Sequence, residues 1–342
     1  MIFAFELLIA LSFTVLAAWA ATGVVRRHAI RVALLDIPNS RSSHAMPIAR
    51  GGGLAIVLVY LAALLFLHLL GLLDAATVTA LAGGGALIAA VGYLDDRKTL
   101  PASARFLVHV LTAAWVVAFL GGFADAFLRS FGLHGVLAGS TLAILALAWM
   151  TNLFNFMDGI DGIAASETVF ICCAGAFIGW WHGADAGLTI AMLALAGATV
   201  GFLVWNWPPA KIFLGDVGSG FLGFSLAALG IAVSARGAMP IEVCVILGGV
   251  FLVDATCTLL RRMLRGDRWY EAHRTHAYQR LARRWNAHLP VTVVVIAVNV
   301  LWLFPWACAA AQFRALAPSF TVAALTPLIV AALVFGAGGR EE

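Results

Sequence analysis

The protein has 342 residues, of which 63% are hydrophobic and 11% are charged. This apolar share, together with a mean hydropathy of +0.98, is far above that of a soluble globular domain. A net charge of +4 could suggest a nucleic-acid partner, but in a membrane protein an excess of Lys and Arg usually reflects topology. We therefore expect a membrane protein with no nucleic-acid partner.

Apolar runs recur along the whole chain, each near the length of about 20 residues that a helix needs to cross a bilayer. They predict a single all-α, polytopic integral-membrane domain over residues 1–342. The eighth run is short and rich in glycine, so we expect a tilted or partly re-entrant helix there. The eleven predicted spans are 2–22, 54–73, 77–94, 105–121, 135–153, 163–181, 186–205, 219–234, 241–260, 291–310 and 319–337.

The first run is expected to be a retained span, although Ala18 to Ala20 resemble a signal-peptide cleavage site. No Lys or Arg precedes this run, whereas Arg26, Arg27 and Arg31 follow it. Because basic residues favour the inner side of a membrane, this pattern places the amino terminus outside.

With this orientation, only Arg129, Arg236 and Arg314 of the 21 Lys and Arg residues lie outside, which leaves 18 inside. The inside connections are also dense in Asp, Asn, His and Gly, whereas the outside ones are short and poor in polar residues. We therefore expect the active site on the cytoplasmic face. The inside loops in question are 23–53, 95–104, 152–162, 206–218 and 261–290.

The first two loops combine acids with arginines. Arg41, His44 and Arg50 lie beside a glycine run that starts a span, a pattern that suits anion binding, although a plain connection would also explain it. Asp95 and Asp96 end the third span. Adjacent carboxylates repel each other, so either one has a raised pKa or both need a cation. The alternative is a solvated acidic cap that Arg97 and Lys98 neutralise.

The next two loops favour a metal-bound phosphate. Asn155, Asp158 and Asp161 lie in a segment with no basic residue, and their oxygen ligands suit Mg²⁺, although a simple polar turn is the alternative. Gly215 and Asp216 lie just before the eighth span, where glycine allows close approach and a helix amino terminus favours phosphate.

The fifth loop contains His273 and His276 at HxxH spacing. Zinc is disfavoured because no further well-placed Cys or His follows, so these residues suit a phosphate or a sugar instead. Asp254 lies inside the ninth span, where an ionisable group usually faces a cavity or a partner. No GxxxxGK[ST] segment occurs, which argues against an ATP-driven pump. All five cysteines fall within apolar runs and are expected to be packing residues.

Between about residue 36 and residue 280, these five motifs in this order resemble the polyprenyl-phosphate N-acetylhexosamine-1-phosphate transferases, glycosyltransferase family 4. The resemblance implies a bacterial inner-membrane enzyme. Its reaction would be attack of undecaprenyl phosphate on the β-phosphate of a UDP-N-acetylhexosamine, giving a lipid diphosphosugar and UMP, with Mg²⁺ as cofactor.

The resemblance also implies roles for single residues. Asp216 looks like the principal Mg²⁺ ligand and Asn155 like its companion, while one of Asp95 and Asp96 would deprotonate or position the lipid phosphate. The implied catalytic residues are therefore Asp95, Asp96 and Asp216. The implied substrate-binding residues are Arg105 for phosphate, Asp161 and Phe213 for uracil, His273, Arg274 and His276 for sugar and diphosphate, and Asp158 without an assigned role. Arg41, His44 and Arg50 of the first loop are expected to bind substrate because of their own anion-binding pattern.

The HRTHAYQ segment lacks the adjacent histidines of the muramoyl-pentapeptide branch and looks more like the branch that starts O-antigen or related surface polysaccharides. The donor sugar stays open among N-acetylfucosamine, N-acetylquinovosamine, N-acetylgalactosamine and N-acetylglucosamine. The polysaccharide, homo-oligomer formation and the choice of base within the Asp pair also stay open. The alternative from another class is a polytopic transporter, which would place its site near the bilayer midplane.

Overall fold

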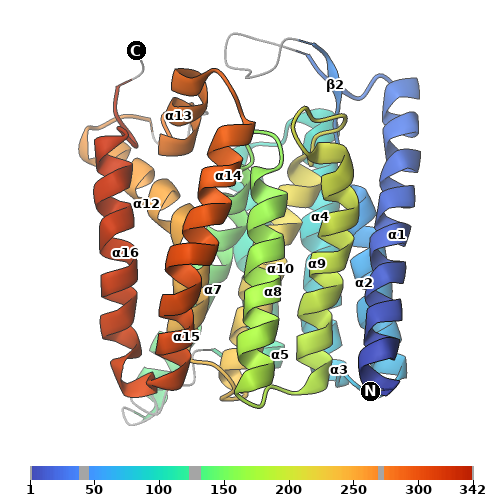
Figure 1. The fold of residues 1–342 in the computed structure, drawn as a ribbon, viewed down its shortest axis with the longest axis vertical. Helices are drawn as coiled ribbons and strands as arrows, with labels where there is room; N and C mark the ends of the chain where they lie inside the picture. The colour runs from blue at the N-terminus through green and yellow to red at the C-terminus, as the bar shows by residue number, and fades with distance from the viewer. Residues whose placement is uncertain (1, 38–45, 123–131, 269–272, 341–342) are drawn as a thin grey trace.

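The computed structural model describes residues 2–37, 46–122, 132–268 and 273–340, with side chains in the first helix described from residue 11 onward. Within these residues the chain is a bundle of roughly parallel helices that run along its longest axis (Figure 1). The predicted all-α class is confirmed. Arg41 and His44 lie outside the described residues.

The first half of the bundle contains a small two-stranded pairing and six spans or span fragments. Its elements are α1 (Ile2–Arg31), β1 (Leu35–Asp36), β2 (Ile48–Ala49), α2 (Gly53–Leu69), the continuous run of α3 (Ala75–Val78), η1 (Thr79–Gly83) and α4 (Gly84–Lys98), α5 (Ala102–Leu120), α7 (Gly132–Met157) and α8 (Ile163–Trp181).

Among its described residues, the second half contains a deeply buried helix and a broken span. Its elements are α9 (Ala186–Asn206), α10 (Asp216–Ala235), α11 (Ile241–Leu247), α12 (Gly249–Leu264), α13 (Ala277–Trp285), the run of α14 (Leu289–Val298), η2 (Asn299–Leu303) and α15 (Phe304–Gln312), then η3 (Arg314–Leu316) and α16 (Ala317–Val334).

Among the described residues, eight helices are long and apolar enough to cross a membrane, and the bent pair α11 and α12 would make a ninth. α2 is apolar but has 17 residues, and α1 coincides with the first predicted run. Every predicted span therefore overlaps a helix. The total of eleven spans and the orientation in the membrane stay predictions.

The re-entrant alternative for the eighth span is wrong, and a break occurs in the ninth span instead. The chain bends by 78° between α11 and α12, at Gly248. By contrast, α10 is one continuous helix, and 89% of its most apolar stretch is buried inside the bundle. Its glycines are contact points: a Cβ on Gly223 would collide with the backbone of Met150 in α7, and Gly92 of α4 lies equally close to the first turn of α10. Small residues let membrane helices approach closely, so glycine here marks the centre of the bundle.

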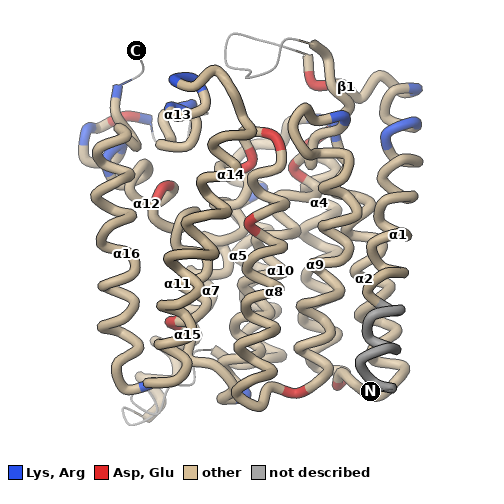
Figure 2. The backbone as a smooth tube through the Cα atoms, viewed as in Figure 1, with Lys and Arg blue, Asp and Glu red and all other residues tan. Residues whose placement is uncertain are grey.

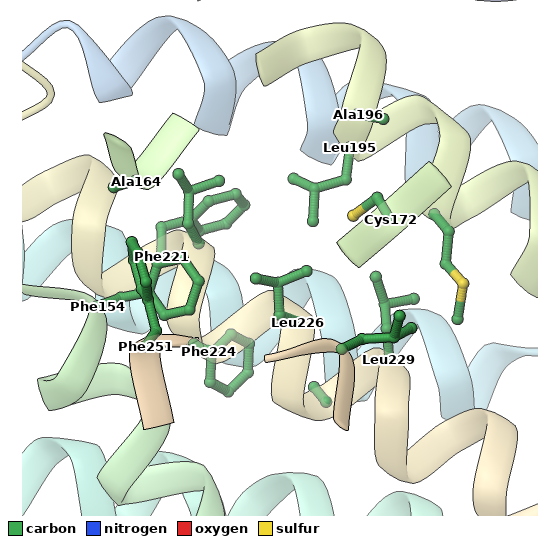
Figure 3. Close-up of a cluster of buried hydrophobic side chains, with 14 of the residues drawn as sticks. Phe154, Ala164, Cys172, Leu195, Ala196, Phe221, Phe224, Leu226, Leu229 and Phe251 are labelled. Atoms are coloured by element: carbon green, nitrogen blue, oxygen red, sulfur yellow. The ribbon is translucent and has the colours of Figure 1, made fainter. Parts of the chain in front are cut away.

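Aromatic side chains fill the interior around α10. Phe221 and Phe224 of α10 lie near Phe154 of α7 and Phe251 of α12 (Figure 3), and the Phe154 and Phe251 rings are 5.1 Å apart. All four are almost fully buried. This packing fixes the end of α10 that begins at Asp216.

Lys and Arg gather at the end of the bundle where α1 and α4 finish and where α13 lies (Figure 2). We call this the site end, because the polar motifs described below also lie there. It is the end that the sequence assigns to the cytoplasm.

Candidate active site

Backbone pairing brings the first and fourth motifs together. β1 and β2 pair antiparallel, and the amide of Phe213 donates to the carbonyl of Ala49 at 2.8 Å. The amides of Gly52 and Gly53 donate to the carbonyls of Phe213 and Leu214 at 2.9 and 2.8 Å. A Cβ on Gly53 would overlap the backbone of Gly218, so only glycine allows this approach. Arg50 therefore lies beside the start of α10.

Arg50 bridges two acids. Its Nε lies 2.8 Å from Oδ1 of Asp96, and its Nη2 donates to Oδ1 of Asp216 at 2.7 Å. Burial opposes the guanidinium charge, but Asp216 and Asp96 outweigh it and raise the pKa of Arg50. The arginine is therefore permanently charged and binds the second motif to the fourth.

Asp96 caps α10. Its side chain is 1% exposed, and its two oxygens accept the amides of Asp216 and Val217 at 2.9 and 3.0 Å. A carboxylate at a helix amino terminus is favoured by the unpaired amides and the helix dipole. The sequence predicted that these amides would bind phosphate; in the structure the carboxylate of Asp96 accepts them instead.

Asp95 is held by different groups. Its oxygens accept from Nη1 of Arg105 and from the amide of Leu100, the latter at 2.5 Å. Arg105 also lies 3.6 Å from Oδ2 of Asp216. The suggested neutralisation of the acid pair by Arg97 and Lys98 is not what the structure shows, because Arg50 and Arg105 pair with these acids and Arg97 lies over the ring of Tyr93.

Asn155 completes the contacts of Asp216. Its Nδ2 donates to Oδ1 of Asp216 at 2.9 Å and lies 3.1 Å from Oγ of Ser219. The side chain of Asp216 is 20% exposed. The structure thus gathers Arg50, Asp95, Asp96, Arg105, Asn155 and Asp216, all predicted from sequence, into one group, here called the Asp216 network.

The donors of this network fit Mg²⁺ bound together with a substrate phosphate. Asp216 offers a partly exposed carboxylate, and Asn155 would offer its carbonyl oxygen after rotation of its amide. Among the described residues no group of three His, Cys, Asp or Glu side chains forms a metal cage. Mg²⁺ is usually bound by one or two carboxylates plus phosphates and water, so a cage is not needed.

Asp158 lies next to this network, immediately after α7. In the part of the chain that the structure describes it has no hydrogen bond or ion pair, which distinguishes it from the other site acids. Burial raises its pKa well above the usual range, and the negative charge of Asp216 acts in the same direction. A binding role for Asp158 stays a prediction.

A cleft of about 610 Å³ opens at the site end, between the segment after α7, the Pro208–Pro209 turn, α13 and the start of α14. Asp161 and Arg274 line it. Oδ2 of Asp161 accepts the amide of Ala210 at 3.0 Å. Phe213, its predicted partner in uracil binding, is not among the described residues that line the cleft.

The HRTH segment is anchored from inside the bundle. Asp254 accepts the amides of Ala277 and Tyr278 at 2.9 and 3.0 Å and so caps α13. Its Oδ1 lies 3.4 Å from Nδ1 of His276, which is 3% exposed. The expectation that Asp254 faces a partner is confirmed. The ring of His273 stacks on the ring of His276, with the ring centres 5.0 Å apart. Of the predicted residues His273, Arg274 and His276, only Arg274 is among the described residues that line the cleft.

The sequence did not single out His288 or Asn206. His288 lines the cleft and lies 3.2 Å from Asp161, and Asn206 accepts the amide of Gly162 and donates to the carbonyl of Ile212, each at 3.0 Å. Both are polar residues at the site end of a predicted span. This position at the end of a span is the sequence feature that could have identified them as site residues.

Comparison with known proteins identifies the family. The model of the family described as glycosyl transferase family 4 matches residues 78–234. A Mycobacterium tuberculosis decaprenyl-phosphate N-acetylglucosaminephosphotransferase is 30% identical over 341 residues, which cover 91% of this chain and 83% of that protein. This chain belongs to glycosyltransferase family 4. The family resemblance seen in the sequence is thereby confirmed.

Further relatives are similar over different lengths. A Bacillus subtilis protein described as a probable undecaprenyl-phosphate N-acetylglucosaminyl 1-phosphate transferase is 29% identical over 302 residues, or 87% of this chain and 83% of its own. A Moorella thermoacetica phospho-N-acetylmuramoyl-pentapeptide-transferase is 38% identical, but over only 120 residues and 35% of this chain. Family membership and the apolar helices make this chain a multi-pass protein of the bacterial inner membrane.

Proposed function

We propose that the protein transfers an N-acetylhexosamine 1-phosphate from a UDP-sugar to undecaprenyl phosphate. An oxygen of the lipid phosphate bonds to the β-phosphorus of the donor, the bond from that phosphorus to the bridging oxygen breaks, and UMP leaves with the bridging oxygen. The observation that carries the proposal is the Asp216 network: a partly exposed carboxylate between two arginines at the end of a membrane bundle. The names of the full-length relatives support it.

Phosphoryl transfer needs alignment and charge neutralisation more than covalent help from the protein. Asp216 and Asn155 would hold Mg²⁺, which when bound neutralises charge on the diphosphate of the donor and on the departing UMP. Arg50 and Arg105 already lie against Asp216 and would face the same phosphates. Charges that are already fixed in place stabilise the transition state well, because the protein does not have to reorganise during the reaction.

The contacts of the Asp pair support a positioning role over proton abstraction. Asp95 accepts from Arg105 and Leu100, and Asp96 accepts from Arg50 and the first amides of α10. A phosphate monoester has a second pKa of about 6, so the lipid phosphate is already largely ionised at neutral pH. We propose that the two acids hold the arginines in place to receive this nucleophile.

The cleft that Asp161 and Arg274 line supports a site for the donor. Its volume of about 610 Å³ is typical of small-molecule sites, which span roughly 300–1,000 Å³. A carboxylate accepts the N3–H of uracil, and an arginine neutralises phosphate. We propose that the nucleoside lies near Asp161 and that the diphosphate extends toward Asp216.

We also propose that the product starts an O-antigen or a related surface polysaccharide. The HRTHAYQ segment supports this branch over muramoyl-pentapeptide transfer, as does the short overlap with the latter enzyme. The donor sugar is one of the four UDP-linked N-acetylhexosamines named above.

The test uses purified full-length protein with undecaprenyl phosphate, Mg²⁺ and a panel of the four donors, with UMP release as the readout. We expect release from one or two donors and none after chelation of Mg²⁺. UDP-N-acetylmuramoyl-pentapeptide serves as the comparison donor. The absence of UMP release from every donor in the panel would overturn the proposal, and preference for the pentapeptide donor would overturn the branch.

A further inference from the structure

We infer that His288 is a positioning residue for the donor nucleotide, because it orients the carboxylate of Asp161 toward the cleft. The inference rests on the proposed function, since it takes Asp161 to contact the nucleoside. Neither the sequence motifs nor the family match, which ends at residue 234, includes His288.

His288 directly precedes α14, and its side chain contacts that of Asp161, which also lines the cleft. Its Nδ1 lies 3.2 Å from Oδ1 of Asp161 and 3.4 Å from the amide nitrogen of the same residue. One ring nitrogen cannot donate to the carboxylate and accept from the amide at once. A lone pair on Nδ1 would face a carboxylate oxygen, so we place the proton on Nδ1 and let it donate to Oδ1.

The first turn of α14 holds both the backbone and the side chain of Asp161. Oγ1 of Thr292 donates to the carbonyl of Asp161 at 3.0 Å, while His288 holds the carboxylate. The amide of Ala210 takes the other carboxylate oxygen. The side chains of His288 and Asp161 are 16% and 11% exposed, so water screens their contact less than it screens a surface pair.

These contacts leave each oxygen of Asp161 able to accept a further hydrogen bond, because a carboxylate offers about four lone-pair positions. A fixed acceptor in the cleft selects a base edge that presents an N–H group. Uracil presents N3–H, whereas cytosine presents a bare N3 acceptor at the same place. His288 therefore contributes to the choice of a uridine nucleotide by preventing the carboxylate from turning away.

The experiment compares His288→Ala with His288→Asn in steady-state kinetics. The Nδ2 of asparagine lies close to where Nδ1 of histidine lies, so it restores the donor. We expect KM for the UDP-sugar to rise about tenfold in the alanine variant, the usual effect of losing a hydrogen bond to a charged group, with kcat within about twofold. The asparagine variant should stay within about threefold of wild type in KM.

Two controls separate positioning from folding. His182→Ala removes a histidine at the end of α8 opposite the site end and should leave KM unchanged. Thr292→Val removes the bond to the backbone of Asp161 and shows what general loosening of α14 does to the melting temperature.

Direct binding of UDP to the solubilised wild type and variants provides a readout that does not need turnover. Unchanged KM and UDP affinity in His288→Ala would overturn the inference and leave the proposed function intact. An equal loss of kcat and melting temperature in both His288 variants would also overturn it, in favour of a structural role. If the wild type binds UDP but transfers no sugar phosphate, the proposed reaction is wrong, and the UDP affinities of the variants still decide the role of His288. If the wild type binds no UDP, both the proposed function and the inference about His288 are wrong.

Discussion

α10 and α13 begin in the same way at the site end, yet their surroundings differ. In each, the first backbone amides donate to a carboxylate from another helix: Asp96 of α4 for α10, and Asp254 of α12 for α13. Arg50 holds Asp96 and links it to a second acid, Asp216.

Asp254, by contrast, accepts from the uncharged hydroxyl of Thr258 and lies near His276. The same capping device therefore has two uses. At α10 it concentrates negative charge, balanced by two arginines, beside the partly exposed carboxylate of Asp216. At α13 it fixes the position of a loop. Four sets of substitutions test this difference, from the largest expected effect to the smallest.

Asp216→Asn is expected to lower turnover by about a thousandfold, because it removes charge where the diphosphate and its metal would bind. The substitution keeps the shape of the side chain and the cap of α10, so the melting temperature should change little. Product formation and thermal unfolding are measured on the same preparation. Turnover like that of wild type would remove Asp216 from the chemistry.

Asp96→Asn and Asp254→Asn form a matched pair, because each replaces one capping oxygen by an amide. Both should lower the free energy of unfolding by about 1–3 kcal/mol, the cost of leaving a buried donor without its acceptor. Only Asp96→Asn also releases Arg50, so it should lower kcat by about a hundredfold. Asp254→Asn should act mainly on the KM for the donor. A larger loss of kcat in Asp254→Asn would reverse the comparison.

The loop at α13 is also fixed by the segment that follows α16. The amide of Gly338 donates to the carbonyl of Thr275 at 2.8 Å, and Gly338 has φ +66 with Thr258 O 2.8 Å from where a Cβ would lie. Gly338→Ala should therefore raise the donor KM severalfold. Gly266→Ala is the control, because Gly266 has φ +74 and open space around it. An equal rise of the donor KM in both variants would show that backbone strain alone causes the effect, and not the contact of Gly338 with the loop.

Asp158→Asn should stabilise the protein slightly at neutral pH in the absence of Mg²⁺. Burial raises the pKa of Asp158 in the folded state, so the folded protein binds this proton more tightly than the unfolded chain does. Wild type therefore loses stability as pH rises above about 4, the ordinary pKa of Asp, toward the folded value. The asparagine variant should gain over wild type as pH rises through that window and show little difference below it. A gain that does not vary with pH would contradict this account.

The sequence predicted the spans well because each is a long apolar run, but it misjudged where the bundle is broken. Glycine produced the error. In α10, glycines such as Gly223 allow neighbouring helices to touch, whereas Gly248 lies at the bend between α11 and α12. In the sequence, a glycine at a helix contact looks the same as a glycine at a bend. Only the contacts with other helices distinguish the two.

The sequence also identified most of the Asp216 network but not its pairing. Arg97 is adjacent to Asp96 in sequence, yet consecutive residues on a helix point in different directions, and Arg97 turns to Tyr93. The cation that reaches Asp96 is Arg50, from a loop that backbone pairing brings to α10. His288 was missed for the same reason, since its partner Asp161 is 127 positions away.

The most direct test of the central claim follows the two phosphorus atoms of the donor. Wild-type protein is supplied with undecaprenyl phosphate and with the accepted UDP-sugar, labelled at the β-phosphorus in one reaction and at the α-phosphorus in another. The account predicts that the β label moves to the lipid fraction while the α label leaves as UMP. Retention of both labels in UDP, with only the sugar moving to the lipid, would contradict it.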